Sequence, residues 1–208
     1  MNEIINKEIA GKLMQIEGKA KGSVFINDMD YVLKKEGEEA IERIEEAAKE
    51  LGYDISLDKF NAEKWYPIGL RVILLLLIKK TLNWEDFEIR KMGKEAVESS
   101  LVLKLSIKLL RSLKKFVKEA PSYWKRYYTI GKLKLVSINE KEGSGIFRLE
   151  DFKVHPILCG VYLEGLFEKL YQLIMGERGR CKHTKCVFKD SPYCEYTSWI
   201  EEKPKIFT

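Results

Sequence analysis

Apolar residues recur along the amino-terminal half of the chain at the spacing of amphipathic helices. Across residues 27–51 they return every three or four positions, with Gly37 as an internal break and Gly52 as a stop signal. The next run, residues 68–78, is apolar on nearly every side except at Arg71 and follows a proline, which is well tolerated at the start of a helix. Such a helix is expected to lie inside the protein or against a partner chain.

A third helical pattern covers about residues 86–118, and the sequence Ala120-Pro121-Ser122 is expected to end it. Beyond Tyr128 the apolar period shortens around a glycine-containing turn, which predicts a hairpin. An amphipathic helix and a second hairpin follow. The order predicts an α+β fold: a helical amino-terminal half, then hairpin, helix and hairpin forming a four-stranded antiparallel sheet packed on helices. The expected later elements are a hairpin over 133–152, a helix over 156–176 and a hairpin over 180–200.

Composition narrows the class of protein. The chain has 208 residues, is 45% hydrophobic and carries a formal net charge of +5, so it is long enough to bury a full core and is neither disordered nor a polyelectrolyte. No linker-like segment divides it, and we expect residues 1–208 to form a single domain.

Its longest apolar run falls short of the ~20 residues that span a bilayer, and the amino terminus lacks the apolar core of a secretory signal. We therefore expect a cytoplasmic protein without a membrane span. The chain contains six asparagines and two glutamines, which points to a heat-adapted source.

Four cysteines and a histidine gather near the carboxyl end. Cys159 lies in the first turn of the predicted helix, while Cys181, Cys186 and Cys194 lie on the final hairpin with His183. Thiolate and imidazole are ligands that zinc prefers, and a tetrahedral site needs four. The pattern predicts a site of Cys159, Cys186 and Cys194, with His183 or Cys181 as the fourth ligand. The alternatives are ordinary buried thiols or a Cys186–Cys194 disulfide, which a reducing compartment disfavours.

The carboxyl-terminal residues resemble a known family. The run Leu163-Glu164-Gly165-Leu166, further helix up to Gly176, and the segment CVFKDSPYCEY at 186–196 resemble the 4-vinyl reductase domain, whose closing hairpin has Cys, seven residues, Cys and an acidic-aromatic pair. The segment KGSVF at 21–25, together with Gly37, resembles the opening of haem NO/oxygen-binding domains. These families share a fold with subunits of the TRAPP vesicle-tethering complex, and the resemblance covers about residues 21–199.

The resemblance implies a dimeric sensor with a structural zinc site near an internal hydrophobic pocket. The zinc ligands of the aromatic-responsive regulators in this superfamily match Cys159, Cys186 and Cys194, but a glutamate stands there at the place of His183. A homodimer and a hydrophobic or aromatic small-molecule ligand are therefore expected. The haem branch holds its propionates with a Tyr-x-Ser-x-Arg run, which this chain lacks, so we do not expect haem.

The sequence favours a sensor over an enzyme. It contains no GxGxxG motif after a strand, no P-loop, no nucleophile elbow and no HExxH motif, so we expect no enzymatic activity. The apolar helix and an aromatic cluster are candidates to line a hydrophobic pocket, although the same residues would equally fill a core. The candidate pocket residues are Trp65, Leu74, Tyr123, Trp124, Tyr127, Tyr128 and Leu163.

Two other functional classes remain open. A ligand-free adaptor or assembly subunit fits the resemblance to TRAPP subunits. A nucleic-acid-binding protein fits the ten basic residues between Lys104 and Lys134, which are interleaved with aromatic residues and only one acidic residue, Glu119. The solvent-exposed face of an ordinary helix can carry the same number of basic residues, so we do not expect nucleic acid as a partner. A sensor of this kind would act through a separate signalling or effector protein.

Overall fold

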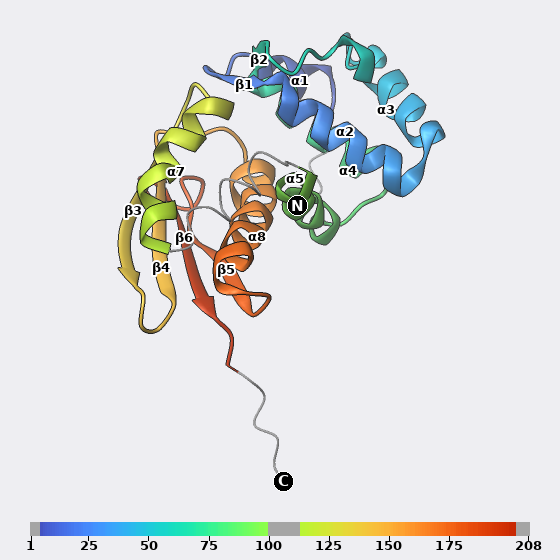
Figure 1. The fold of residues 1–208 in the computed structure, drawn as a ribbon. Coiled ribbons are helices and arrows are strands. Elements are labelled where there is room, and N and C mark those ends of the chain that lie inside the picture. The colour runs from blue at the N-terminus through green and yellow to red at the C-terminus, as the bar shows by residue number, and fades with distance from the viewer. Residues whose placement is uncertain (1–4, 100–112, 203–208) are drawn as a thin grey trace.

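The computed structural model describes residues 5–99 and 113–202. Over these residues the chain consists of an amino-terminal group of helices and a four-stranded antiparallel sheet packed against helices (Figure 1). This arrangement confirms the α+β fold class and the order of hairpin, helix and hairpin that the sequence predicts. Among the described residues, no helix is both long enough and apolar enough to span a membrane.

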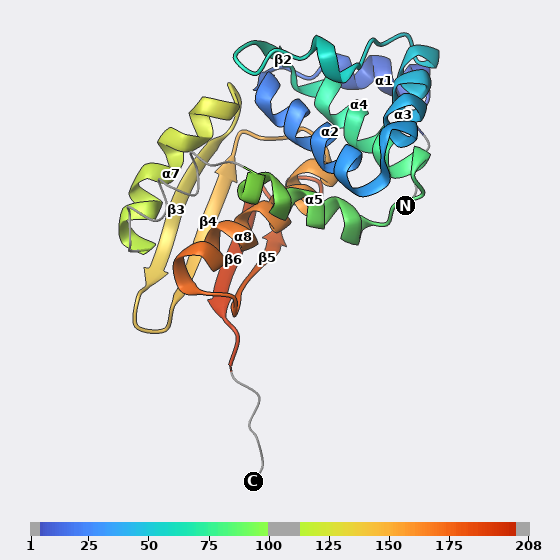
Figure 2. The ribbon, with the colours of Figure 1, turned by 45° about the vertical axis from the view of Figure 1, so that its right-hand side comes forward.

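The amino-terminal group is built around the apolar helix α4. Residues 68–78 are buried except for half-buried Leu70, and α1 and α3 pack against this helix (Figure 2). The chain itself therefore covers the apolar surface, which no longer argues for a partner copy. The elements are α1 (Lys7–Met14), β1 (Lys19–Lys21), α2 (Gly22–Glu36), α3 (Glu38–Glu50), η1 (Leu57–Lys59), β2 (Trp65–Pro67) and α4 (Ile68–Thr81).

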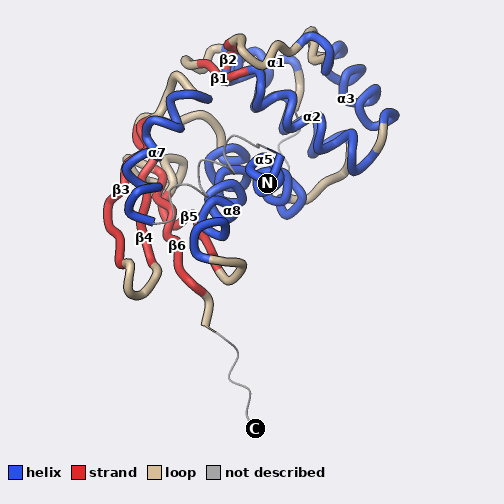
Figure 3. The backbone as a smooth tube through the Cα atoms, viewed as in Figure 1, coloured by secondary structure: helices blue, strands red, loops and turns tan. Residues whose placement is uncertain are grey.

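The sheet joins the two hairpins through their second strands. Its strand order is β3-β4-β6-β5 (Figure 3). Phe147 lies opposite Tyr196 where the hairpins meet. Residues alternate between the two faces of a strand. In β4, Phe147 and Leu149 are buried toward the helices, while Arg148 on the opposite face pairs with Glu195 at 2.8 Å. The strands are β3 (Lys132–Asn139), β4 (Ser144–Glu150), β5 (Gly179–Lys185) and β6 (Cys194–Ile200).

Helices α7 (Leu113–Tyr127) and α8 (Leu163–Met175) pack against the sheet, and α5 (Asp86–Ser99) crosses α8 (Figures 1 and 2). Two glycines permit this close crossing. A Cβ atom at Gly93 would lie 2.1 Å from the carbonyl oxygen of Tyr162, and one at Gly165 would lie 2.0 Å from that of Arg90. The inner space between α5, α7, α8 and the sheet holds the candidate site.

Several boundaries differ from the predictions. Helix α7 continues through Pro121 to Tyr127, although the sequence predicts its end at 120–122. Tertiary packing overrides the helix-breaking tendency of proline, because Trp124 stacks on Tyr128 with 4.4 Å between ring centroids. The predicted continuous helix over 86–118 appears as the end of α5 and the start of α7, and residues 100–112 lie outside the described part of the chain.

Other elements carry no clear signal in the sequence. Helix α2 begins at Gly22, five residues before the predicted start at Asn27, and the short pair β1–β2 was not predicted. The helix predicted from residue 156 opens as a π-helix, η2 (Ile157–Tyr162), before α8. A π-helix widens the helical turn, and such segments are frequent at functional sites. Here η2 contributes Cys159 and Tyr162, which belong to two different clusters.

Candidate ligand cavity and metal centre

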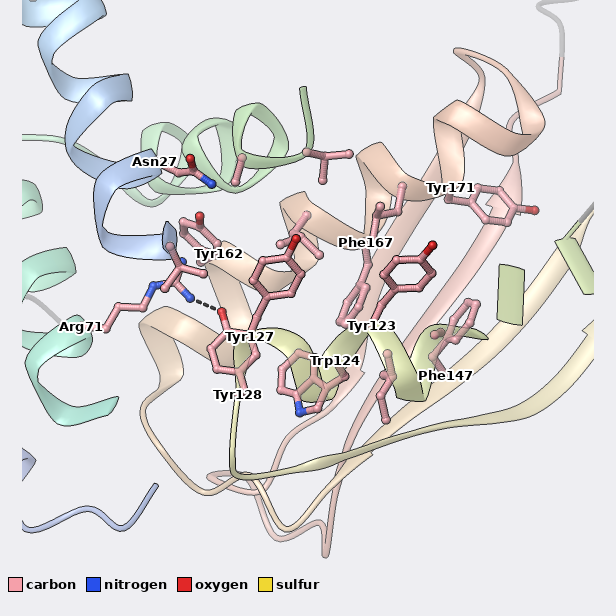
Figure 4. Close-up of a pocket in the computed structure, with 17 residues that line it drawn as sticks. Asn27, Arg71, Tyr123, Trp124, Tyr127, Tyr128, Phe147, Tyr162, Phe167 and Tyr171 are labelled. Atoms are coloured by element: carbon pink, nitrogen blue, oxygen red, sulfur yellow. Dashed lines mark hydrogen bonds between the residues drawn. The ribbon is translucent and has the colours of Figure 1, made fainter. Parts of the chain in front are cut away.

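A cavity of about 110 Å³ lies between the amino-terminal helices and the sheet, bordered by α2, α4, α5, α7, η2, α8, β3 and β4 (Figure 4). Its walls are mainly aliphatic and aromatic, with contributions from Leu133, Phe147 and Phe167. A dry cavity of about 150 Å³ suffices to bind benzene. At about 110 Å³ the present cavity is smaller, so it takes at most about one ring unless its walls move.

One end of this cavity carries a buried charged network. Arg71 and Asp28 are each 1% exposed in their side chains, and Arg71 donates from Nε to Asp28 at 3.1 Å and from Nη2 at 3.4 Å. Tyr162 donates to Asp28 at 2.6 Å, and Arg71 also donates to the hydroxyl of Tyr128. Burial raises the pKa of Asp28, whereas Arg71 and Tyr162 oppose the shift. The network ties α2 to α4 and η2.

Four of the seven predicted pocket residues line the cavity: Tyr123, Trp124, Tyr127 and Tyr128. They lie on α7 and just after it, and Trp124 is held by a hydrogen bond from its Nε1 to the carbonyl oxygen of Ile130 at 2.9 Å. Figure 4 shows the Tyr123 and Tyr127 rings projecting from α7 toward α8. The π-helix also brings Tyr162 to the cavity, which periodicity alone does not indicate.

The other three predicted pocket residues lie elsewhere. Trp65 is 37% exposed on β2, Leu74 is buried inside α4, and Leu163 is buried at the start of α8; none of them lines this cavity. Arg71 and Asn27 line it instead. An arginine within an apolar helix is a signal for a buried polar contact, because an unpaired buried charge is very costly.

A second cluster lies at the junction of η2 with β5 and β6. One ligand atom from each of Cys159, His183, Cys186 and Cys194 lies within 4.8 Å of the other three. Tetrahedral zinc with Zn–S bonds of about 2.3 Å spaces its sulfur ligands ~3.8 Å apart. Small side-chain movements would therefore close this group around one ion.

The chemistry of the donor set fits zinc. The three cysteines are buried, and Nε2 of His183 is a buried nitrogen without a hydrogen-bond partner among the described residues. A hydrogen bond from the Cys159 thiol lowers the pKa of Cys194 to about 4, while the pKa of Cys159 is raised. One thiolate is thus already favoured, and a bound metal ion deprotonates further thiols by its own charge.

Neighbouring polar contacts hold the cluster in place. Glu164 on α8 accepts a hydrogen bond from the backbone N–H of His183 at 2.8 Å, and Tyr196 donates to the carbonyl oxygen of Cys159 at 2.6 Å.

Cys181, the other candidate for the fourth position, is buried on β5 but lies outside this group of ligand atoms. Burial raises the pKa of its thiol to about 12. The geometry therefore favours His183 as the fourth ligand.

The basic segment 104–134 is described only in part. Residues 104–112 lie outside the described structure, and Lys118, Lys125 and Arg126 are exposed on α7. The aromatic residues interleaved with these cations line the cavity or are buried. In the described part, they do not form an exposed platform on which bases would stack.

Comparisons with known proteins identify the fold. No protein-family model matches the sequence, and no curated protein matches it. Among solved structures, an H-NOX protein from S. oneidensis in the Fe(II)NO ligation state is 14% identical, with a TM-score of 0.64 over 88% of this chain and 99% of that chain. The unliganded Fe(II) H-NOX protein from K. algicida is 13% identical, with a TM-score of 0.58 over 88% and 97%. A structure from work on haem distortion in the H-NOX family is 12% identical, with a TM-score of 0.63 over 90% of this chain and 98% of that chain.

These neighbours correct the expectation about haem. We expected no haem because the chain lacks a Tyr-x-Ser-x-Arg run, but the structures that share its fold are haem domains, so that expectation is wrong. The described lining offers haem iron no His, Cys or Met, and both histidines of the chain lie outside the lining. Tyr123 and Tyr127 are the lining tyrosines without a hydroxyl hydrogen bond among the described residues, so their phenol oxygens are the candidate iron ligands there. A cavity of about 110 Å³ does not hold the four-ring haem macrocycle unless its walls rearrange. This chain shares the fold of these H-NOX structures.

Proposed function

We propose that this chain is a small-molecule-binding sensory or regulatory domain whose ligand occupies the cavity described above. The observation that carries the proposal is a void with apolar walls, lined by residues from both the amino-terminal helices and the sheet region. A ligand there contacts α2, α4, α5, α7 and α8 together, so its binding free energy is available to change how these elements pack. An adaptor without a ligand would have no need of the void.

The test is ligand-dependent thermal stability. Haem, ethylbenzene and acetophenone are each added to the purified protein, because a ligand that binds only the folded state raises the melting temperature by mass action. At 100 times Kd, stabilisation of about 2.7 kcal/mol corresponds to roughly 5–10 °C for a chain of this size. If none of the three raises the melting temperature of the wild type, the proposal fails.

A cavity-filling variant supplies the control. Ala120→Phe places a ring in the lining, whereas Ser122→Phe places the same ring at an exposed position two residues along α7. We expect Ala120→Phe to abolish the ligand-induced shift and Ser122→Phe to retain it. Equal shifts in both variants would mean that the ligand binds elsewhere.

We further propose that Cys159, His183, Cys186 and Cys194 hold one structural zinc ion. The proposal is supported by the close grouping of their ligand atoms and by the unpartnered Nε2 of His183. Four protein ligands fill a tetrahedral site and leave no position for an activated water, so the ion would pin η2 to β5 and β6 without a catalytic role. The Cys-x7-Cys spacing supports a relationship with the 4-vinyl reductase branch of the superfamily.

Metal content tests the zinc site. Protein purified without chelators should contain one equivalent of zinc, and Cys194→Ser and His183→Ala should lose it and melt at a lower temperature. Cys181→Ser is the matched control, because its thiol is buried on the same hairpin but lies outside the cluster. Cysteine thiols must lose their protons to bind zinc, so zinc affinity should fall in acid. Zinc-free protein with four freely titrating thiols, or full zinc in His183→Ala, would contradict this assignment.

A further inference from the structure

The cavity has a polar end whose residues differ in kind from its walls. Arg71 is the one charged residue among those found to line it, and Asn27 on α2 lines the same side of the cavity, with Tyr162 between the two side chains (Figure 4). The positive charge of Arg71 is already balanced by Asp28, with 3.1 Å between Nε and the carboxylate. The polar end of the cavity therefore carries a hydrogen-bonding group whose charge is neutralised.

Donors remain available at this end. A guanidinium group has five N–H donors, and the hydrogen bonds of Arg71 to Asp28 and Tyr128 use three of them, one on each nitrogen. Each terminal nitrogen thus retains one N–H. The Asn27 side chain, which is half-buried, makes no hydrogen bond within the described part of the chain. A buried donor without an acceptor destabilises the protein, so an acceptor supplied by a ligand would stabilise the two spare N–H groups of the buried Arg71.

We propose that the ligand of this cavity is an uncharged molecule of about one ring that carries a hydrogen-bond acceptor, such as a carbonyl oxygen, and that Arg71 donates to this oxygen, with Asn27 as a second donor in the cavity wall. The inference rests on the proposed function and adds the class of ligand. A neutral acceptor accepts hydrogen bonds from the spare donors without adding a charge to the buried site. A carboxylate would add a second buried anion beside Asp28, and one cation would then face two negative charges.

Three compounds of similar size separate the possibilities: ethylbenzene without an acceptor, acetophenone with a neutral acceptor and benzoate with an anionic one. Their Kd values are measured by isothermal titration calorimetry at pH 7 with the full chain. A hydrogen bond to a charged group contributes about 1.5–3 kcal/mol, so we expect acetophenone to bind at least roughly tenfold more tightly than ethylbenzene. Benzoate should bind more weakly than acetophenone.

Variants test whether Arg71 and Asn27 are responsible. Removing Arg71 alone would leave Asp28 as an unpaired buried charge and threaten folding, so the pair is neutralised together in Asp28→Asn/Arg71→Gln. The readout is the ratio of the ethylbenzene Kd to the acetophenone Kd in the same variant, and we expect this ratio to fall from at least roughly ten to near one, whatever the change in either affinity alone. Asn27→Leu leaves the ion pair between Arg71 and Asp28 intact, and this variant should lose part of the preference for acetophenone over ethylbenzene.

Each outcome distinguishes this inference from the proposed function. Equal affinities for ethylbenzene and acetophenone, tightest binding of benzoate, or an undiminished preference in both variants would overturn the inference and leave a ligand-binding cavity. If haem alone bound, the proposed ligand class would be wrong, but the proposal that this chain is a ligand-binding domain would stand. Failure of all four compounds to bind would overturn both.

Discussion

At the scale of single residues, Arg71 shows which contacts can be predicted from the sequence and which cannot. It interrupts an otherwise apolar run, and our sequence predictions did not use this signal: an isolated buried charge is costly, so a buried arginine needs an anionic partner. That partner is Asp28, 43 positions earlier in the chain. Nothing in the periodicity of α2 distinguishes Asp28 from a solvent-exposed carboxylate. The pairing depends on how α2 packs near α4 and η2, which is a property of the fold.

The cysteine cluster shows the same limit. Residue types and spacing narrow the metal site to five candidates, but they do not separate His183 from Cys181, which lie two positions apart on one strand. The structure places His183 with Cys159, Cys186 and Cys194 and leaves Cys181 aside. The difference arises from the position of η2 against the hairpin, because η2 carries Cys159.

Glu168 gives a prediction of pH dependence. Burial raises its pKa, but ion pairs with Lys94 and Arg90 lower it more, so the pKa lies below its ordinary value of 4.5. A carboxylate of this kind stabilises the fold fully above about pH 5 and loses that contribution as pH falls through its folded pKa. We therefore expect the stability gap between wild type and Glu168→Gln to be constant from pH 7 to about 5.

Below about pH 4.5 the gap should narrow. Urea unfolding at a series of pH values measures it, with Glu50→Gln at an exposed position of α3 as the control that shows no such gap. A gap that widens in acid would contradict the assignment of Glu168 as an ionised partner of Lys94 and Arg90.

At the scale of elements, periodicity locates the helices and strands but misplaces some of their ends. Pro121 predicts a helix end, yet α7 continues because its last turn packs aromatic rings against the sheet region. The π-helical opening of α8 has no signature in the spacing of apolar residues, although it determines where Cys159 and Tyr162 point. Both departures result from tertiary packing, which overrides local propensity.

The crossing of α5 and α8 depends on glycine. Gly93→Ala and Gly165→Ala each place a Cβ about 2 Å from a backbone oxygen of the other segment, and we expect each to destabilise the protein by about 1–3 kcal/mol through overpacking. Gly11→Ala in α1 is the matched control, since no atom lies within 4 Å of its added Cβ. It should be neutral or stabilising by up to about 1 kcal/mol. Urea denaturation of the three variants measures these effects, and unchanged stability in Gly93→Ala and Gly165→Ala would contradict the close crossing.

At the scale of the whole molecule, the order of elements predicts the fold class, because the chain changes from helical to strand periods in the order helices, hairpin, helix, hairpin. The cavity is different: its walls come from eight elements, and no local pattern encodes a void. We propose that residues 1–208 form one domain, supported by the hydrogen bond from Tyr162 to Asp28 that joins the two halves. A homodimer stays a prediction of the family resemblance alone, since α4 is covered by its own chain.

The most direct test of a ligand in this cavity uses the indole N–H signals of the four tryptophans in a two-dimensional ¹H–¹⁵N spectrum. Trp124 lines the cavity, whereas Trp65 and Trp199 are exposed at 37% and 39%. On titration with acetophenone, the Trp124 indole signal should shift and saturate while those of Trp65 and Trp199 stay in place. Saturable binding that leaves the Trp124 signal unmoved, or that moves only the exposed indoles, would contradict the account.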